Sequence, residues 1–150
     1  MLEITSVSSS HLKSVAALVD DYRQFYGEES DPIRAQEYLE DRIETNASFI
    51  FCALLGKRAV GFTQLFPSFS TVKLARVLIF NDLYVDTACR NQGVATALIE
   101  NAITFAKKNG FAAIRLATQK DNLSAKKLYQ RFGWKRNIAF DYYSLSTASS

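Results

Sequence analysis

Apolar residues recur at helical spacing near the start of the chain. A short apolar run at residues 2–7 predicts a strand. After it, apolar side chains return every three or four positions as far as Tyr26, which predicts a helix capped by one of the serines at 8–10. Asp31 followed by Pro32 marks a second helix start, because a carboxylate accepts from free amides and proline suits the first helical position.

Runs of β-branched and aromatic residues in the middle of the chain predict strands. Two of them, residues 48–55 and 59–66, are joined by a Gly-Lys-Arg turn, which indicates a hairpin. Residues 73–85 predict a third strand. A helix is expected at about residues 92–108, because apolar residues again return at helical spacing.

The last third of the chain alternates strand and helix. A strand is predicted at residues 112–118, a helix at 122–132 and a final strand at 139–145. The full order, β-α-α-β-β-β-α-β-α-β, predicts an α/β (α+β) fold in which a mixed, mostly antiparallel central sheet carries helices on both faces. No repeat or linker divides the sequence, so we expect a single domain over residues 1–150.

The composition is that of an ordinary globular domain, with 48% apolar and 22% charged residues. No apolar run approaches the roughly 18 residues that a membrane span needs, and the N-terminus does not resemble a signal peptide. The two cysteines match no metal or redox spacing, and a single histidine gives little basis for a zinc site or a Ser-His-Asp hydrolase. We therefore expect a cytoplasmic protein with no metal and no membrane partner.

Charge is distributed unevenly along the chain. Residues 1–50 carry four Lys/Arg against ten Asp/Glu, whereas residues 101–150 carry nine against two. The basic half is suited to a phosphate-rich ligand and the acidic half to a cation. Two solvated faces of opposite charge explain the same pattern.

The turn before the helix at 92–108 is the main candidate site. It contains Arg90, Gly93 and Ala95 in the pattern Arg-x-x-Gly-x-Ala. A glycine at a helix start lets an anion approach the free backbone amides, although it also serves as plain turn chemistry. Neither G-x-G-x-x-G nor Gly-Lys-Ser/Thr is present, so a dinucleotide fold and a nucleoside-triphosphate loop are not expected.

A second motif lies some thirty residues further on. Asn122 opens a helix that ends in Leu128-Tyr129 and is followed by Gly133-Trp134. Together with the glycine turn and the order of elements, this motif resembles the GCN5-related N-acetyltransferase (GNAT) family over nearly the whole chain. The sequence is particularly similar to the small bacterial members near the polyamine and amino-acid acetyltransferases.

The resemblance implies a GNAT fold with acetyl-CoA (coenzyme A) as cofactor. In the family, amides of the turn hold the pyrophosphate and the preceding strand pairs its backbone with the pantetheine, which resembles an added strand. A lysine on the last helix could meet the adenosine phosphate, or simply lie on a solvated face. The expected cofactor-binding residues are Leu83, Tyr84, Val85, Arg90, Asn91, Gln92, Gly93, Val94, Ala95, Thr96, Asn122 and Lys126.

The chemistry requires a neutral amine, stabilisation of an oxyanion and a proton for the leaving thiolate. The resemblance implies Tyr129 as the general acid. Relatives often carry a glutamate on the strand before the turn, but the matching position here is Asn81, which cannot take a proton. Asp82 beside it is the candidate catalytic carboxylate, although strand alternation sends it to the opposite face unless a bulge intervenes.

The loop after the first helix lines the acceptor site in relatives. We therefore expect Tyr26, Glu28, Glu29 and Asn81 to bind the substrate, while a solvated polar loop is an equal interpretation. The acidic first third favours the primary amine of a small cationic metabolite as the acceptor. Because holding both substrates together demands few catalytic groups, we expect direct transfer in a ternary complex.

Other functions stay open at this point. Within the enzyme class, the acceptor could be an amino acid or a protein lysine or N-terminus. A non-catalytic acyl-CoA-binding regulatory module is another alternative, which the missing glutamate favours and the intact tyrosine opposes. No nucleic-acid-binding motif is present, so no nucleic-acid partner is expected. Dimers are frequent in the family, which leaves room for a homodimer.

Overall fold

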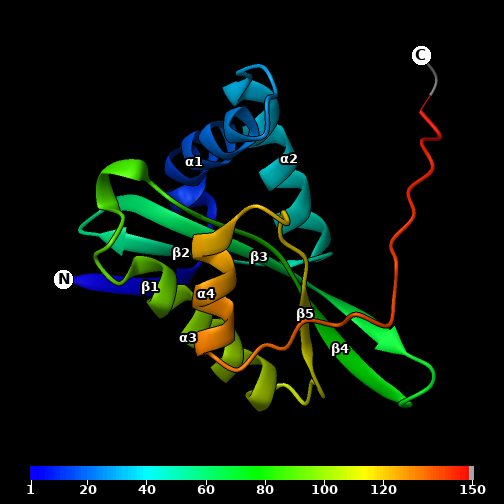
Figure 1. Cartoon of the computed structure of the whole chain (residues 1–150). Helices are drawn as coiled ribbons and strands as arrows, with labels where there is room; N and C mark the ends of the chain where they lie inside the picture. Colours follow the sequence, from blue (N-terminus) through cyan, green and yellow to red (C-terminus); the bar gives the residue numbers. More distant parts are fainter. Residues whose placement is uncertain (149–150) are drawn as a thin grey trace. The chain divides into compact units, whose positions relative to one another are not determined.

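The computed structural model describes residues 1–148, in two compact units. The first unit is Met1–Ala117 and the second begins at Thr118. Five strands form one sheet in the first unit, in the order β1-β2-β3-β4-β5 (Figure 1). All neighbours are antiparallel except β4 and β5, which are parallel. The strands are β1 (Leu2–Ser6), β2 (Phe49–Leu55), β3 (Arg58–Ser70), β4 (Ala75–Val85) and β5 (Ile114–Leu116).

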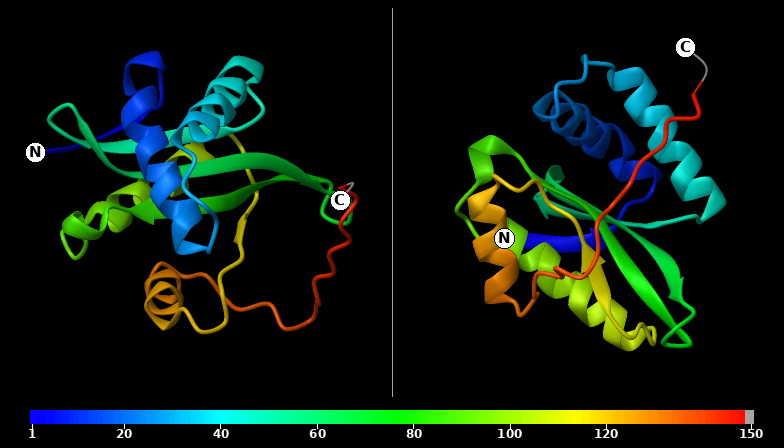
Figure 2. Two further views of the ribbon diagram at one scale, coloured as in Figure 1. Left: turned by 90° about the horizontal axis from the view of Figure 1, so that it is seen from above. Right: turned by 45° about the vertical axis from the view of Figure 1, so that its right-hand side comes forward.

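Helices cover both faces of this sheet. In the first unit, α1 and α2 lie on one face and α3 lies on the other (Figure 2). The helices are η1 (Ser9–His11), α1 (Leu12–Phe25), α2 (Pro32–Thr45), η2 (Thr87–Cys89), α3 (Val94–Lys108) and, in the second unit, α4 (Leu123–Arg131). The predicted cap of α2 is confirmed, because Asp31 Oδ1 accepts from the Arg34 amide at 3.1 Å. The predicted fold class is thus confirmed.

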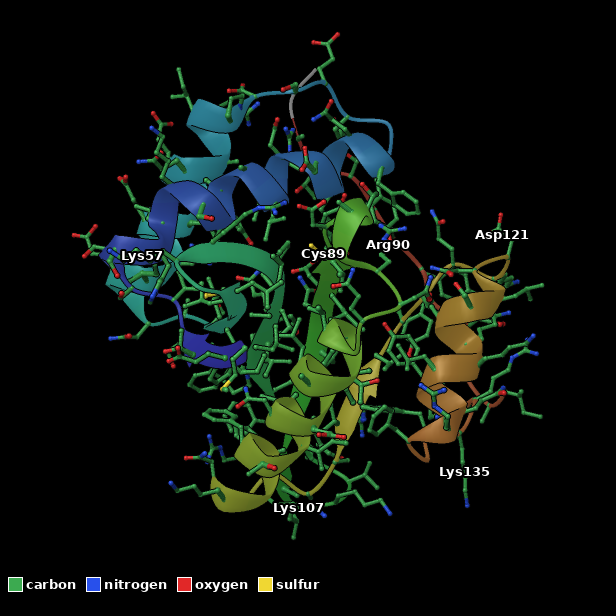
Figure 3. The ribbon with its side chains drawn as sticks, turned by 90° about the vertical axis from the view of Figure 1, so that its left-hand side faces the viewer. Lys57, Cys89, Arg90, Lys107, Asp121 and Lys135 are labelled. Atoms are coloured by element: carbon green, nitrogen blue, oxygen red, sulfur yellow. The ribbon has the colours of Figure 1, made fainter. Side chains whose placement is uncertain are left out.

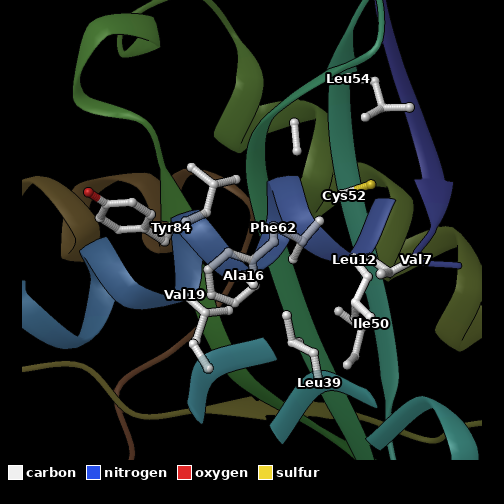
Figure 4. Packing of buried hydrophobic residues seen from close by; sticks show 14 residues of the cluster. Val7, Leu12, Ala16, Val19, Leu39, Ile50, Cys52, Leu54, Phe62 and Tyr84 are labelled. Atoms are coloured by element: carbon white, nitrogen blue, oxygen red, sulfur yellow. The ribbon is translucent and has the colours of Figure 1, made fainter. Parts of the chain in front are cut away.

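The core between α1, α2 and the sheet is built from the apolar stripes of the two helices. Val15 and Leu39 are almost fully buried in the first unit. Around them Val19, Phe62 and Tyr84 pack together (Figure 4). This core packs α1 and α2 against residues of β2, β3 and β4.

The opposite core needs a glycine at Gly61. A Cβ built there would lie 2.9 Å from Val94 Cγ1, 3.1 Å from the Tyr84 carbonyl oxygen and 3.2 Å from Leu98 Cδ1. Only glycine therefore allows the first turns of α3 to approach β3 this closely.

β4 is irregular at Asn81. Gln64 pairs with Asp82, and the next residue of β3, Leu65, pairs with Phe80, so Asn81 is the extra residue of a β-bulge. The pairing of β4 with β5 also stops at Phe80. Beyond the bulge, residues 82–85 pair with β3 on one side, and no described strand pairs with them on the other.

The predicted final strand at residues 139–145 is not formed. Within the described part of the chain this segment contains no helix or strand, and Phe140 and Tyr143 are 68% and 93% exposed. The alternation of aromatic and polar residues there expresses β propensity, but a strand also needs a partner backbone and a face to bury. The predicted strand at 112–118 is likewise shortened to Ile114–Leu116.

Candidate active site

A pocket of about 280 Å³ opens in the first unit between α1, α2 and strands β2, β3 and β4. Apolar side chains form its inner wall, namely Val19, Ala35, Leu39, Ile50 and Phe62. Polar side chains complete the lining, namely Tyr22, Arg23, Arg34, Tyr38, Gln64, Asn81 and Asp82. An apolar wall with a few convergent polar groups is typical of a small-molecule site.

The bulge brings Asn81 and Asp82 into the same pocket, although successive residues of a regular strand face opposite ways. Two amides hold the Asp82 carboxylate. Asn81 Nδ2 donates to Asp82 Oδ2 at 2.9 Å, and Gln64 Nε2 donates to the same oxygen at 3.0 Å. Ser48 donates in turn to Gln64 Oε1 at 2.8 Å, which fixes the way the Gln64 amide faces. The candidate catalytic carboxylate is therefore held in one orientation.

Tyr22, a residue of α1, lies beside the Asp82 carboxylate. Its ring contacts those of Phe62 and Tyr84, with centroids 5.7 Å and 5.6 Å away. Burial raises the pKa of the Tyr22 phenol well above its ordinary value, and the negative charge of Asp82 adds to the effect. Tyr22 therefore stays a neutral phenol that can donate a hydrogen bond inside the pocket.

The loop between α1 and α2 is anchored by a buried carboxylate. Asp20 accepts from Ser30 Oγ at 2.7 Å and from the Asp31 amide at 2.6 Å. The hydrogen bond from Ser30, then the one from Asp31, lowers the pKa of Asp20 below its ordinary value. Arg23 holds the same loop by donating to the Glu29 carbonyl oxygen at 3.1 Å.

Three expected substrate-binding residues lie in or next to this loop. Tyr26, Glu28 and Glu29 are exposed and do not line the pocket, whereas Asn81 does. Glu28 instead faces Arg23, with an N–O distance of 4.0 Å. The structure thus brings Asn81 to Asp82 and leaves the other three at the surface of the loop.

The unpaired side of β4 includes the expected pantetheine-binding residues. Leu83, Tyr84 and Val85 pair with β3 through one side of their backbone. The Tyr84 side chain is buried against α1, so the backbone of this stretch is what is left to pair with a ligand. A strand edge of this kind accepts an extended molecule with amide groups.

The expected anion turn follows directly. Asn91 and Gly93 have φ values of 61° and 81°, in the left-handed region, and no side chain caps the start of α3. Left-handed residues at a helix start turn successive amides toward one side, which suits an anion. The other turn residues expected to meet the cofactor share this segment: Gln92 is exposed, Val94 is buried in the core, and Ala95 and Thr96 are half-buried.

Arg90 is tied to the strand end rather than pointing freely at the turn. Its Nε donates to the Val85 carbonyl oxygen at 3.2 Å, and its guanidinium lies 5.5 Å from the centre of the Tyr84 ring. Figure 3 shows Arg90 and Cys89 at one end of α3, with Lys107 at the other. Arg90 therefore stabilises the shape of the turn.

The second unit contains the remaining predicted residues. Asn122 caps α4, since its Oδ1 accepts from the Ala125 amide at 3.2 Å, and Lys126 lies half-buried on the same helix. Tyr129, the expected acid, packs edge-on against Trp134 with ring centroids 5.7 Å apart. The second sequence motif thus builds one helix and its aromatic end.

Several site residues were missed by sequence reasoning. Tyr22 and Tyr38 look like ordinary members of amphipathic helices, and Arg34 looks like a solvated charge. Gln64 carried the one usable signal, because a polar residue inside an apolar strand is buried only when it is hydrogen-bonded.

Comparison with known proteins gives consistent matches. Residues 15–134 match the model of a family described as "Acetyltransferase (GNAT) family". An uncharacterized N-acetyltransferase of Bacillus subtilis (strain 168) is 34% identical over 145 residues, or 97% of each chain. A crystal structure of a probable acetyltransferase superposes with a TM-score of 0.91 at 36% identity and covers 99% of both chains. Thialysine N-epsilon-acetyltransferase of Caenorhabditis elegans is 25% identical over 127 residues, which cover 85% of this chain and 79% of the relative.

Proposed function

The chain belongs to the acetyltransferase (GNAT) family and is an N-acetyltransferase, and we propose that it transfers the acetyl group of acetyl-CoA directly to the primary amine of a small cationic metabolite. One observation carries this proposal. Asn81 and Asp82 both line the polar pocket and begin the unpaired stretch of β4, so an acceptor site and a cofactor edge meet at these residues.

Members of the family use acetyl-CoA, and the first unit has two features that fit it. The backbone of Leu83 and Val85 provides a strand edge for the pantetheine amides. The free backbone amides that follow Gly93 lie at the positive end of α3 and suit the negatively charged pyrophosphate. In the second unit, we propose Asn122 and Lys126 of α4 as further cofactor-binding residues.

Bound acetyl-CoA would supply a thioester that a neutral amine can attack. In our proposal, a carboxylate oxygen of Asp82 accepts the proton that the amine loses, directly or through a water molecule. The Tyr129 hydroxyl donates the proton that the leaving sulfur requires. The pocket holds the amine in place, which contributes several kcal/mol to a direct transfer.

Two further observations support a small amine acceptor. The pocket volume of about 280 Å³ lies just below the ~300–1,000 Å³ usual for ligand sites. The relative from Caenorhabditis elegans is named for thialysine, a small amine. Tyr26, Glu28 and Glu29 lie in the adjoining loop, where we propose that they meet the outer part of the acceptor.

We propose a single acetyltransferase domain, since the residues matched by the family model span both compact units.

Within residues 1–148, none of the helices has the length and apolar character to span a bilayer. Both cysteines are free and buried, which supports a cytoplasmic location.

The test is consumption of acetyl-CoA, read as free thiol, against polyamines, amino acids and lysine peptides. Tyr129→Phe keeps the ring against Trp134 and removes the hydroxyl, so we expect kcat to fall about 100-fold with acetyl-CoA affinity unchanged. Tyr142→Phe, an exposed tyrosine in the same unit, is the matched control. Tight acetyl-CoA binding without transfer to any amine would favour a CoA-binding regulatory module instead.

A further inference from the structure

The charges that line the pocket do not match a purely cationic acceptor. Asp82 is the one carboxylate among the lining residues, whereas Arg23 and Arg34 both line it. The acidic residues of the neighbouring loop, Glu28 and Glu29, lie outside the lining. A polyamine, which carries only positive charge, would meet two guanidinium groups in this pocket.

Arg23 is already committed to the structure. Its Nη1 donates to the Glu29 carbonyl oxygen at 3.1 Å, and the same nitrogen lies 4.0 Å from Asp20 Oδ1. Its Nη2 lies 4.0 Å from Glu28 Oε2. These contacts hold the loop between α1 and α2, so Arg23 has little capacity left for a ligand.

Arg34 has that capacity. It lies in the first turn of α2, and 75% of its side chain is exposed. Within residues 1–148 its ion pairing is limited to Asp31, where Nε lies 4.0 Å from Oδ2, and Asp31 also caps the helix through the Arg34 amide. The two Nη groups of Arg34 thus form a planar pair of donors at the rim of the pocket, which suits a carboxylate.

From this arrangement we infer that the acceptor is an amino acid, with its reacting amine at Asp82 and its carboxylate at Arg34. The two groups come from different elements, β4 and α2, and line one pocket of about 280 Å³. The volume is small enough to require a compact acceptor. The inference rests on the proposed acetyl transfer and narrows its acceptor from cationic amines in general to those that carry a carboxylate.

The test compares each amino acid with its decarboxylated form. Three pairs present the same amine with and without a carboxylate: lysine and cadaverine, ornithine and putrescine, alanine and ethylamine. We expect kcat/KM to be at least about tenfold higher for the carboxylated member of at least one pair, the size of one charge-assisted hydrogen bond. We expect Arg34→Gln to remove that preference, chiefly by lowering kcat/KM for the carboxylated member of each pair.

Lys57→Gln is the matched control for the loss of one positive charge. Lys57 lies in the turn between β2 and β3, outside the pocket lining (Figure 3). The Lys57→Gln variant should keep the preference for the carboxylated amine. In the native protein, raised salt should weaken this preference, because Arg34 is largely exposed.

The outcomes distinguish failure of the amino-acid acceptor from failure of the proposed acetyl transfer. Equal or better turnover of the decarboxylated amines, an unchanged preference in Arg34→Gln, or acetylation of lysine peptides alone would each overturn the amino-acid acceptor and leave the acetyltransferase standing. Acetyl-CoA binding without transfer to any of these amines would overturn it as well. Absence of acetyl-CoA binding would overturn the proposed function itself.

Discussion

The side-chain amide of Gln64 donates from Nε2 to Oδ2 of Asp82 at 3.0 Å. The two residues are partners in the β3–β4 register and lie next to the bulge at Asn81. Gln64 also donates to the Tyr38 hydroxyl at 3.2 Å, so one buried amide joins β4 to α2 across the pocket. The proposed acceptor pocket is therefore held together by a side chain that has no part in the proposed proton transfers.

Asp82→Asn tests the proposed proton acceptor. The change keeps the shape of the side chain and removes the basic oxygen, so kcat should fall about 100-fold with little change in acetyl-CoA affinity. Steady-state kinetics measure kcat, and a thermal melt checks that the variant is folded. Full turnover in a folded Asp82→Asn enzyme would show that the amine loses its proton elsewhere.

Gly93→Glu tests the anion turn. A bulky carboxylate at the start of α3 should weaken acetyl-CoA binding by about 10- to 100-fold, because it displaces charge-assisted hydrogen bonds worth ~1.5–3 kcal/mol. Isothermal titration calorimetry gives the dissociation constant. Gly110→Glu is the control, since Gly110 at the other end of α3 is also left-handed (φ 74°) and has open space where a Cβ would lie. Equal loss of affinity in both variants would point to strain instead.

Asp20→Asn tests the anchor of the loop between α1 and α2. Asp20 is 6% exposed, and its carboxylate accepts from Ser30 and from the Asp31 amide, so the variant should lose about 1–3 kcal/mol of unfolding free energy at neutral pH. Urea unfolding measures this loss. Ser30→Ala removes one donor only and should cost less.

The same anchor predicts a pH dependence. The pKa of Asp20 is lowered in the folded state, so the carboxylate stabilises the fold fully above its unfolded pKa of about 3.9. This contribution is lost as the pH falls through the lower, folded pKa. As the pH falls below about 5, the difference in unfolding free energy between the native protein and Asp20→Asn should therefore shrink. A difference that stays constant would mean that the charge of Asp20 contributes nothing.

Gly61→Val tests the close approach of α3 to β3. Its Cβ would meet the Tyr84 carbonyl oxygen at 3.1 Å, and a backbone atom cannot rotate away as the Val94 side chain can. We expect a loss of about 1–3 kcal/mol in urea unfolding, the usual cost of overpacking. Gly61→Ala places the same Cβ against the Tyr84 carbonyl oxygen, so it should also be destabilising, and a Gly61→Ala variant as stable as the native protein would contradict this account.

Local patterns in the sequence were sufficient for most of the elements. Apolar spacing predicted α1, α2 and α3, because a helix buries one stripe whatever it packs against. Asp31 before Pro32 predicted the start of α2, and Gly93 predicted a turn at the start of α3, where the structure then shows left-handed residues. These signals act over a few residues and can be read without the rest of the fold.

The tertiary structure alone decided the rest. Only the pairing of β3 with β4 reveals that Asn81 is an extra residue, and this bulge brings Asp82 into the pocket beside it. The approach of Gln64 and Arg34 to that pocket depends on how α2 packs over β3, across gaps in sequence that no local pattern encodes. The segment at 139–145 failed as a strand for the same reason, since β propensity is local but a strand exists only with a partner. Local sequence thus determined most of the helices and strands and the position of the turn before α3, whereas contacts between distant segments determined the pocket.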